Sequence, residues 1–210
     1  MAAPEPNALT VAPCTRKAAA YAVMHWHYSQ AMPAGKLITF GVWESGEYIG
    51  AVIYGRGASP FLGVAYNLPQ TELCELVRVA LREHTAPVSQ IVAASLRELK
   101  RTNPGLRLVV SFADPAEGHH GGIYQAGNWI YTGTSGATQM IHLNGRAQHV
   151  RTVGARYKTN IDWLRQNVDP NAHITIAPPK HRYLMPLDRA LRRRLEKRRR
   201  PAPKPAGPDD

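Results

Sequence analysis

Three segments between Leu73 and Asp114 decide the fold: LCELVRVAL at 73–81, PVSQIVAASLRELKRT at 87–102 and LRLVVSFAD at 106–114. The first alternates apolar and polar residues, as a half-buried strand does. The second has apolar residues at helical spacing behind a proline, which favours the first turn of a helix. The third is a short apolar run typical of a buried strand. Strand, helix and strand in this order predict a parallel strand pair joined by a right-handed crossover.

Further elements are expected on both sides of this unit. Thr15 can cap a helix from Arg16 to about Trp26. Strands are expected at 37–43 and 47–55, at Thr138–Leu143 and Arg146–Val153 around Asn144-Gly145, and at 174–176, with a basic helix over 157–166. The fold class is therefore α+β, with a mixed, mostly antiparallel central sheet flanked by helices.

The charge of the chain favours a polyanionic partner. The 210 residues include 26 Lys and Arg against 15 Asp and Glu, which gives a formal net charge of +11. Eleven of the cations lie between Lys180 and Lys204. We therefore expect one domain over 1–179 and a C-terminal arm over 180–210, made of a basic helix and a disordered Pro-rich tail. The arm is interpreted as a phosphate-binding segment, and a solubilising tail is the alternative.

The cysteine content and the apolar segments indicate the cellular compartment of the protein. Cys14 and Cys74 form no CxxC pattern, which argues against a disulfide framework and a cysteine zinc site. The N-terminus lacks the features of a signal peptide, and no apolar run reaches the ~20 residues that span a bilayer. These features predict a cytoplasmic protein without a membrane partner, and they give no indication of its oligomeric state.

A cluster of reactive side chains follows the last of the three segments. The apolar strand delivers Asp114 at its carboxyl end, the edge of an α/β sheet where ligands bind. His119, His120 and Tyr124 follow within ten residues, and these residue types ligate metals or transfer protons. The alternative is that Asp114 caps the following turn and the histidines are solvated. The spacing alone leaves both interpretations open.

Two other features are ambiguous on their own. His25 and His27 point to opposite sides of a continuing helix, so they bind one metal only if the helix ends near Trp26. Glu75 and Arg78 lie in an otherwise apolar strand, where they either pair with each other or have a task. The start of the next helix, around 86–90, offers backbone amides to a pyrophosphate, although no GxGxxG or GxxxxGK[ST] motif is present.

Several of these segments resemble known families. The series from Lys36 to Asp114 resembles the acyl-CoA-binding half of a GNAT-type acetyltransferase, with REHTAP at 82–87 in place of the usual Gly-rich turn. The segment SFADPAEGHHGGIYQAGNWIYTG at 111–133 is similar to the signature of the Mom family of bacteriophage DNA-modification proteins. HYS at 27–29 and the hairpins at 40–55 and 143–153 fit the same family. The resemblance covers roughly residues 20–165.

The resemblance implies a GNAT-like fold and a function. The family converts adenine to N6-carbamoylmethyladenine and so shields phage DNA from host restriction. The amine of adenine is hidden in double-stranded DNA, so the expected partner is a duplex from which an adenine is flipped into a pocket. Two alternatives are an ordinary GNAT N-acetyltransferase for a small amine or a protein, and a non-enzymatic basic DNA-binding protein.

The resemblance also implies site residues, with acetyl-CoA and iron as cofactors. The expected catalytic residues are His27, Tyr28, Arg78, Asp114 and Tyr124. The expected cofactor-binding residues are Val79, Ala80, Leu81, Pro87, Val88 and Ser89. The expected iron ligands are His27, Tyr28 and Asp114. The cations expected to hold the DNA backbone are Arg146, Arg151, Arg156, Lys158, Lys180 and Arg182.

Overall fold

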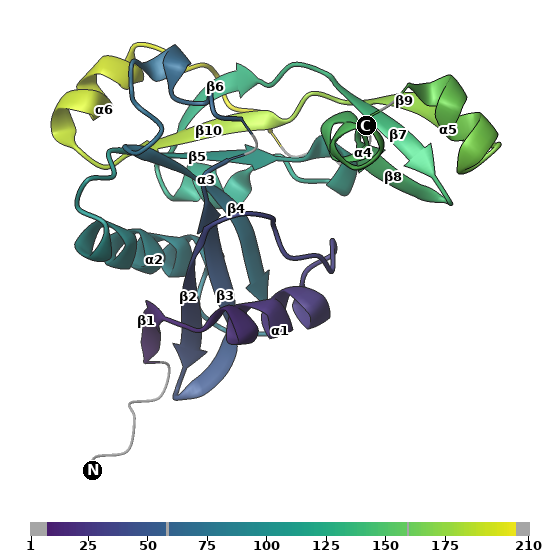
Figure 1. Cartoon of the computed structure of the whole chain (residues 1–210). Helices are drawn as coiled ribbons and strands as arrows, with labels where there is room; N and C mark the ends of the chain where they lie inside the picture. Colours follow the sequence, from purple (N-terminus) through teal and green to yellow (C-terminus); the bar gives the residue numbers. More distant parts are fainter. Residues whose placement is uncertain (1–7, 58, 159, 205–210) are drawn as a thin grey trace. The chain divides into compact units, whose positions relative to one another are not determined.

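The computed structural model describes residues 8–57, 59–158 and 160–204 (Figure 1). The chain divides into two compact units. Unit 1 takes the residues up to 112, residues 121–133 and the residues from 182 on, and unit 2 takes residues 113–120 and 134–181. Unit 1 is thus assembled from three separate stretches of chain, including the C-terminal one.

Unit 1 is built on a seven-stranded sheet with the order β1-β2-β3-β4-β5-β10-β6. The first four strands pair antiparallel, and β4 pairs parallel with β5. This arrangement confirms the predicted mixed sheet and the parallel pair around the helix at 88–102. The strand bounds are β1 Leu9–Pro13, β2 Leu37–Glu44, β3 Glu47–Gly55, β4 Leu73–Leu81, β5 Leu108–Ala113, β6 Ile130–Thr134 and β10 His181–Pro186.

Helices α1 (Arg16–Trp26) and α2 (Val88–Thr102) cover opposite faces of this sheet (Figure 1). Thr15 caps α1 as predicted, since its side chain accepts a hydrogen bond from Ala18 N. Ile53 of β3 packs against α1 in one apolar cluster. The next residue, Tyr54, points to the other face, where its hydroxyl bonds Ser95 of α2 at 2.6 Å.

A β-bulge divides β4 into two halves. Ile53 of β3 pairs with Arg78, whereas Tyr54 pairs with Leu76, so Val77 is an extra residue on β4. Cross-strand partners lie on the same face of a sheet, and the bulge therefore places Arg78 on the face of Ile53, the one that α1 covers. Strict alternation from Cys74 would have placed Arg78 on the face of α2.

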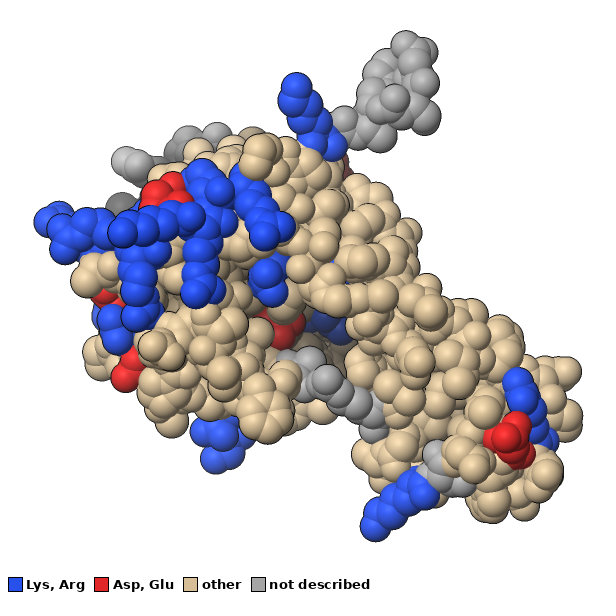
Figure 2. All heavy atoms as spheres, turned by 90° about the horizontal axis from the view of Figure 1, so that it is seen from above, with Lys and Arg blue, Asp and Glu red and all other residues tan. Residues whose placement is uncertain are grey.

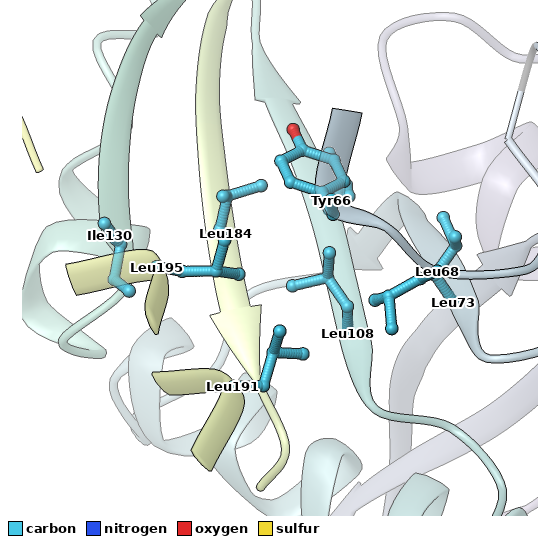
Figure 3. Close-up of a cluster of buried hydrophobic side chains, with 9 residues drawn as sticks. Tyr66, Leu68, Leu73, Leu108, Ile130, Leu184, Leu191 and Leu195 are labelled. Carbon is cyan, nitrogen blue, oxygen red and sulfur yellow. The ribbon is translucent and has the colours of Figure 1, made fainter. Parts of the chain in front are cut away.

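The basic C-terminal segment is built into unit 1. We expected it to begin an appended arm at residue 180, but β10 lies between β5 and β6 in the sheet. Helix α6 (Arg189–Glu196) then packs Leu191 and Leu195 into a cluster with Leu184 and Leu108 (Figure 3). The predicted helix is present, preceded by a strand that the sequence analysis missed. The expected tail falls mostly on residues 205–210, outside the described part of the chain.

Arginines of this segment also bind the body of unit 1. Arg194 and Arg198 donate to the carbonyls of Tyr66 and Ala65, which belong to the short 3₁₀ helix η1 (Val64–Tyr66), and Arg199 donates to Trp129 O. Other cations remain exposed, and Figure 2 shows Lys and Arg gathered on the side of the molecule where Figure 1 places α6. The segment therefore combines a structural role with a positive surface.

Unit 2 contains a three-stranded antiparallel sheet, β8-β7-β9, and two helices. Their bounds are β7 Thr138–Leu143, β8 Arg146–His149, β9 His173–Ala177, α4 Val150–Tyr157 and α5 Ile161–Asn167. The turn at Asn144-Gly145 is confirmed, but residues 150–153 are helical, so the strand predicted to Val153 was too long. The helix predicted over 157–166 is broken where Lys158 takes a positive φ of 52° and Asn160 caps α5.

Two short elements complete the structure. The 3₁₀ helix η2 (Pro115–Glu117) belongs to unit 2, and α3 (Gly122–Ala126) belongs to unit 1. The core of unit 2 is separate and contains Ile141, Leu143, Val153 and Leu164. Across the residues that the structure describes, none of the helices combines the length and the apolar character needed to cross a bilayer.

Candidate active site

The centre of the site is the point where β4 and β5 separate. The two strands pair from Leu73 and Leu108 as far as Leu76 and Ser111, and β4 then continues to Leu81 without β5 beside it. We call this point the strand fork. Ser111 Oγ lies there, 2.9 Å from Leu76 O and 2.8 Å from the hydroxyl of Tyr124, and it is hydrogen-bonded to both.

Tyr124 reaches the strand fork from α3. Its side chain is 8% exposed, and its ring packs against Trp129 and Tyr183, with ring centroids 5.0 Å away in each case. Burial raises the pKa of Tyr124 to about 12, although the hydrogen bond with Ser111 lowers it, and the nearby Glu75 and Tyr28 raise it further. The phenol is therefore protonated at neutral pH and can donate a proton or a hydrogen bond.

Arg78 follows the β-bulge on β4. Its Nη1 donates to Val77 O at 2.7 Å, while its Nε is buried and donates to no group in the described part of the chain. The predicted alternative, an ion pair between Arg78 and Glu75, is not among the ion pairs of the described residues. Arg78 therefore carries a buried donor near the strand fork for which the described part of the chain offers no acceptor.

The motif at 25–29 forms the end of α1. His27 caps the helix, with its backbone N–H on Val23 O, and its Nδ1 accepts from the backbone and side chain of Ser29 at 3.1 and 2.9 Å. Tyr28 is 57% exposed, and its ring lies 4.3 Å from that of His27. Tyr28 also contributes to the electrostatics of Tyr124. The structure thus brings Tyr28 toward the strand fork within unit 1.

Asp114 belongs to unit 2, whereas His27, Tyr28, Arg78 and Tyr124 belong to unit 1. Its Oδ1 accepts from Ala116 N at 3.1 Å, so the turn-capping alternative is confirmed. Its Oδ2 lies 2.6 Å from Lys180 Nζ. The local structure therefore engages both carboxylate oxygens, and a catalytic role for Asp114 remains a prediction from the resemblance.

The described residues give no support for the expected iron. Across residues 8–57, 59–158 and 160–204, no three His, Cys, Asp or Glu side chains lie close enough together to hold a metal ion. His27 and Tyr28 belong to unit 1 and Asp114 to unit 2. This ligand set therefore stays a prediction from the resemblance, and we derive no step through a metal.

The expected cofactor segment surrounds the start of α2. Val79, Ala80 and Leu81 form the half of β4 beyond the strand fork, Pro87 is the N-cap of α2, and Val88 and Ser89 form its first turn. The connecting residues 82–87 are held by the end of β2, because Glu44 accepts from Thr85 N at 2.9 Å and from Ala86 N at 2.7 Å. These two hydrogen bonds lower the pKa of Glu44.

The expected DNA-binding cations fall into two groups. Lys180 pairs with Asp114, and Arg182 donates to the side chain and backbone of Thr132, so both have partners within the protein. Arg146, Arg156 and Lys158 are exposed on unit 2, with Arg156 lying over the ring of Tyr157. The side chain of Arg151 is outside the described part of the chain.

Two residues of the site were not predicted from the sequence. Ser111 links Tyr124 to β4, and the only signal for it was a hydroxyl within an apolar strand. Glu44 accepts hydrogen bonds from two backbone amides just before α2, about 40 residues away in sequence. No local sequence pattern predicts such a contact. Both act through hydrogen bonds between distant segments of the chain.

Known structures share this architecture. The aminoglycoside acetyltransferase AAC(6')-Ib, solved in complex with coenzyme A and kanamycin, is similar with a TM-score of 0.51 and 9% identity, covering 89% of this chain and 98% of that one. A probable GNAT-family acetyltransferase from Chromobacterium violaceum has a TM-score of 0.47 and 10% identity over 87% of this chain and 85% of that one. The predicted GNAT-like fold is confirmed.

Sequence comparison extends over the same region. The methylcarbamoylase Mom of Escherichia phage Mu is 24% identical over 173 residues, which cover 80% of this chain and 71% of the phage Mu protein. A model of the Mom protein family matches residues 8–204, which include the strand fork, unit 2 and the C-terminal strand and helix. The chain therefore belongs to the Mom protein family.

Proposed function

We propose that this chain is a DNA-modifying transferase that places a carbamoylmethyl group on N6 of adenine in phage DNA. The observation that carries the proposal is the buried, protonated hydroxyl of Tyr124 at the strand fork of a Mom-family chain. The similarity to the phage Mu methylcarbamoylase supports the choice of reaction.

The residues at the strand fork supply general chemistry for group transfer. When N6 of adenine gains a bond to carbon it loses a proton, and the leaving group of the donor takes one up. The hydroxyl of Tyr124 lies at the strand fork and can supply that proton or donate a hydrogen bond, although its pKa of about 12 makes it a weaker acid than an ordinary tyrosine. The Nε of Arg78, which donates to no group in the described part of the chain, is a candidate donor for a carbonyl or an anionic group. By the strand register it lies on the face of α1, whereas Ser111 lies on the face of Leu76 and Tyr54.

An exposed aromatic ring follows the end of α1. Tyr28 is 57% exposed and lies on unit 1 near Tyr124, whereas Trp129 and Tyr131 are packed in the core. A flipped base is held by stacking on aromatic side chains as well as by hydrogen bonds to its edge. Tyr28 is therefore the side chain that we assign to stacking on adenine.

A thioester on a pantetheine arm is the ligand class that the fold supports. Attack of N6 on a thioester carbonyl gives an acyl amide, whereas a carbamoylmethyl group is joined through its CH2 carbon and also contains an amide nitrogen. We therefore route no bond-forming step through the thioester carbonyl. The acetyltransferase of matching fold was solved with coenzyme A. In our proposal the pantetheine arm runs along Val79–Leu81, where β4 has no parallel neighbour and its backbone groups can pair with an amide-bearing ligand.

We also propose that exposed cations of α6 hold the DNA backbone, together with those of unit 2. Arg189 and Arg193 of α6 and its C-cap Lys197 are exposed. Arg194, Arg198 and Arg199 are exposed as well, but they donate to carbonyls of unit 1. Replacing Arg189, Arg193 and Lys197 by glutamine is expected to reduce the slope of log K against log salt by roughly 2–3, because about 0.9 counterion is released per phosphate neutralised.

The slope is measured by fluorescence anisotropy of a labelled duplex over a salt series. The matched control replaces Arg189 and Arg193 by lysine and Lys197 by arginine. This variant keeps all three charges and should keep the slope. An unchanged slope in the glutamine variant would show that α6 makes no phosphate contacts.

Restriction protection tests the function itself. Plasmid DNA from bacteria that express the chain should resist endonucleases whose sites contain adenine, because a bulky N6 group blocks the major-groove edge of that base. Endonucleases that recognise only G·C pairs serve as the control and should still cut. Equal cutting by both classes, with soluble protein present, would argue against adenine modification.

A further inference from the structure

The carboxylate of Glu44 occupies a position that suits a phosphate. It accepts hydrogen bonds from two consecutive backbone amides, Thr85 N at 2.9 Å and Ala86 N at 2.7 Å, directly before Pro87 and the first turn of α2. Consecutive amides at the start of a helix, with the positive end of its dipole, form a favourable environment for an anion. Here the anion is supplied by the chain itself, from the end of β2.

Two other positions of this connection offer no free backbone amide. Arg82 N donates to Ile49 O, and Pro87 has no N–H to offer. The Arg82 side chain pairs with Glu47 at 3.2 Å, so a second acidic residue lies beside the loop. A diphosphate that approached the amides of Thr85 and Ala86 would be repelled by the carboxylate of Glu44, which already accepts hydrogen bonds from both.

We propose that Glu44 is a specificity-determining residue that selects against ligands presenting a diphosphate at the start of α2. The inference rests on the proposed thioester ligand. It narrows that class to thioesters on a pantetheine arm that place no diphosphate at the start of α2. The arm itself meets the free half of β4, where Glu44 makes no contact. Acetyl-CoA and S-acetylpantetheine share this arm and differ in the 3′-phosphoadenosine diphosphate, so an effect of Glu44 that is confined to acetyl-CoA arises in that part of the molecule.

The experiment measures binding of both compounds to the purified full chain by calorimetry, for the wild type and for Glu44→Gln. The glutamine keeps the shape and loses the charge. Acetyl-CoA affinity is expected to rise by roughly tenfold or more in the variant. The reason is that the wild-type carboxylate of Glu44 repels the diphosphate and competes with it for the same two amides. S-acetylpantetheine affinity should change less than about twofold on the same argument.

Glu47→Gln is the matched control, since it removes an equal charge beside the same loop without touching the amides. It should leave the ratio of the two affinities near the wild-type value. Glu44→Ala serves as a second variant, and its thermal melt reports whether the loop stays folded. A rise of acetyl-CoA affinity relative to S-acetylpantetheine affinity, in Glu44→Gln or in Glu44→Ala, supports the proposal.

Two outcomes would overturn the proposal: an acetyl-CoA to S-acetylpantetheine ratio that is the same in wild type and both Glu44 variants, or no acetyl-CoA binding to any of them. In either case Glu44 is only a tertiary cap of α2. Failure of the proposed DNA modification is seen separately, in the restriction assay of the wild-type chain, so the two ideas stand or fall on different measurements.

Discussion

Replacing Tyr124 by phenylalanine should lower DNA modification by about a hundredfold or more, the range that a positioned proton donor contributes. The hydroxyl is the only group removed, and it lies at the strand fork, hydrogen-bonded to Ser111. The ring that remains still packs on Trp129 and Tyr183. Losing this hydrogen bond is expected to cost roughly 1 kcal/mol of unfolding free energy, which a domain of this size tolerates.

Tyr183→Phe is the matched control for this prediction. Tyr183 belongs to the same aromatic cluster and is fully buried, and its hydroxyl accepts from Gln125 Nε2 at 3.1 Å. This variant removes an equivalent hydroxyl that does not bond Ser111. The amount of modified DNA per soluble protein should stay within about threefold of the wild type, since only stability changes. Equal losses in both variants would mean that Tyr124 acts by packing alone.

Loss of the C-terminal segment should unfold unit 1. A chain that ends at residue 179 lacks β10, which lies between β5 and β6, as well as Leu184, Leu191 and Leu195 of the core cluster. Each buried leucine is worth roughly 2–5 kcal/mol against replacement by alanine, while whole domains are stable by about 5–15 kcal/mol. We therefore expect an aggregated or unfolded product. Removal of a segment that was only an appended tail would leave unit 1 folded.

Leu191→Ala tests the same packing in the full-length chain. It is expected to lower the free energy of unfolding by about 2–4 kcal/mol, measured by denaturant titration. Arg193→Ala, two residues along the same helix and exposed, should change it by less than about 0.5 kcal/mol. A soluble, cooperatively folding chain of residues 1–179 would contradict the placement of β10 and α6.

Most elements of unit 1 could be predicted from the sequence because their signals are local. Thr15 before an Ala-rich run, Pro87 before a helical stripe and the Ser45-Gly46 turn each determine the backbone of their own neighbourhood. The strand at 181–186 was missed because its neighbours are basic, although Tyr183 and Leu184 are fully buried. Its pairing with distant strands decides its structure, and local charge does not reveal that.

The site was less accessible to sequence reasoning. Tyr124 and Arg78 came from the resemblance, while the β-bulge at Val77 that turns Arg78 to the face of α1 is a feature of strand pairing. The spacing at Asp114 left capping and function open, and the structure confirms the cap without testing the function. The contact of Glu44 with Thr85 and Ala86 joins segments 41 and 42 residues apart, which no local pattern encodes.

Mass spectrometry of nucleosides from plasmid DNA tests the central claim most directly. Bacteria expressing the wild-type chain should yield a deoxyadenosine that carries the mass of a carbamoylmethyl group, and cells with the Tyr124→Phe chain or an empty vector should yield only the ordinary nucleoside. Unmodified deoxyadenosine from cells that contain soluble wild-type protein, or an undiminished modified peak with Tyr124→Phe, would contradict the account.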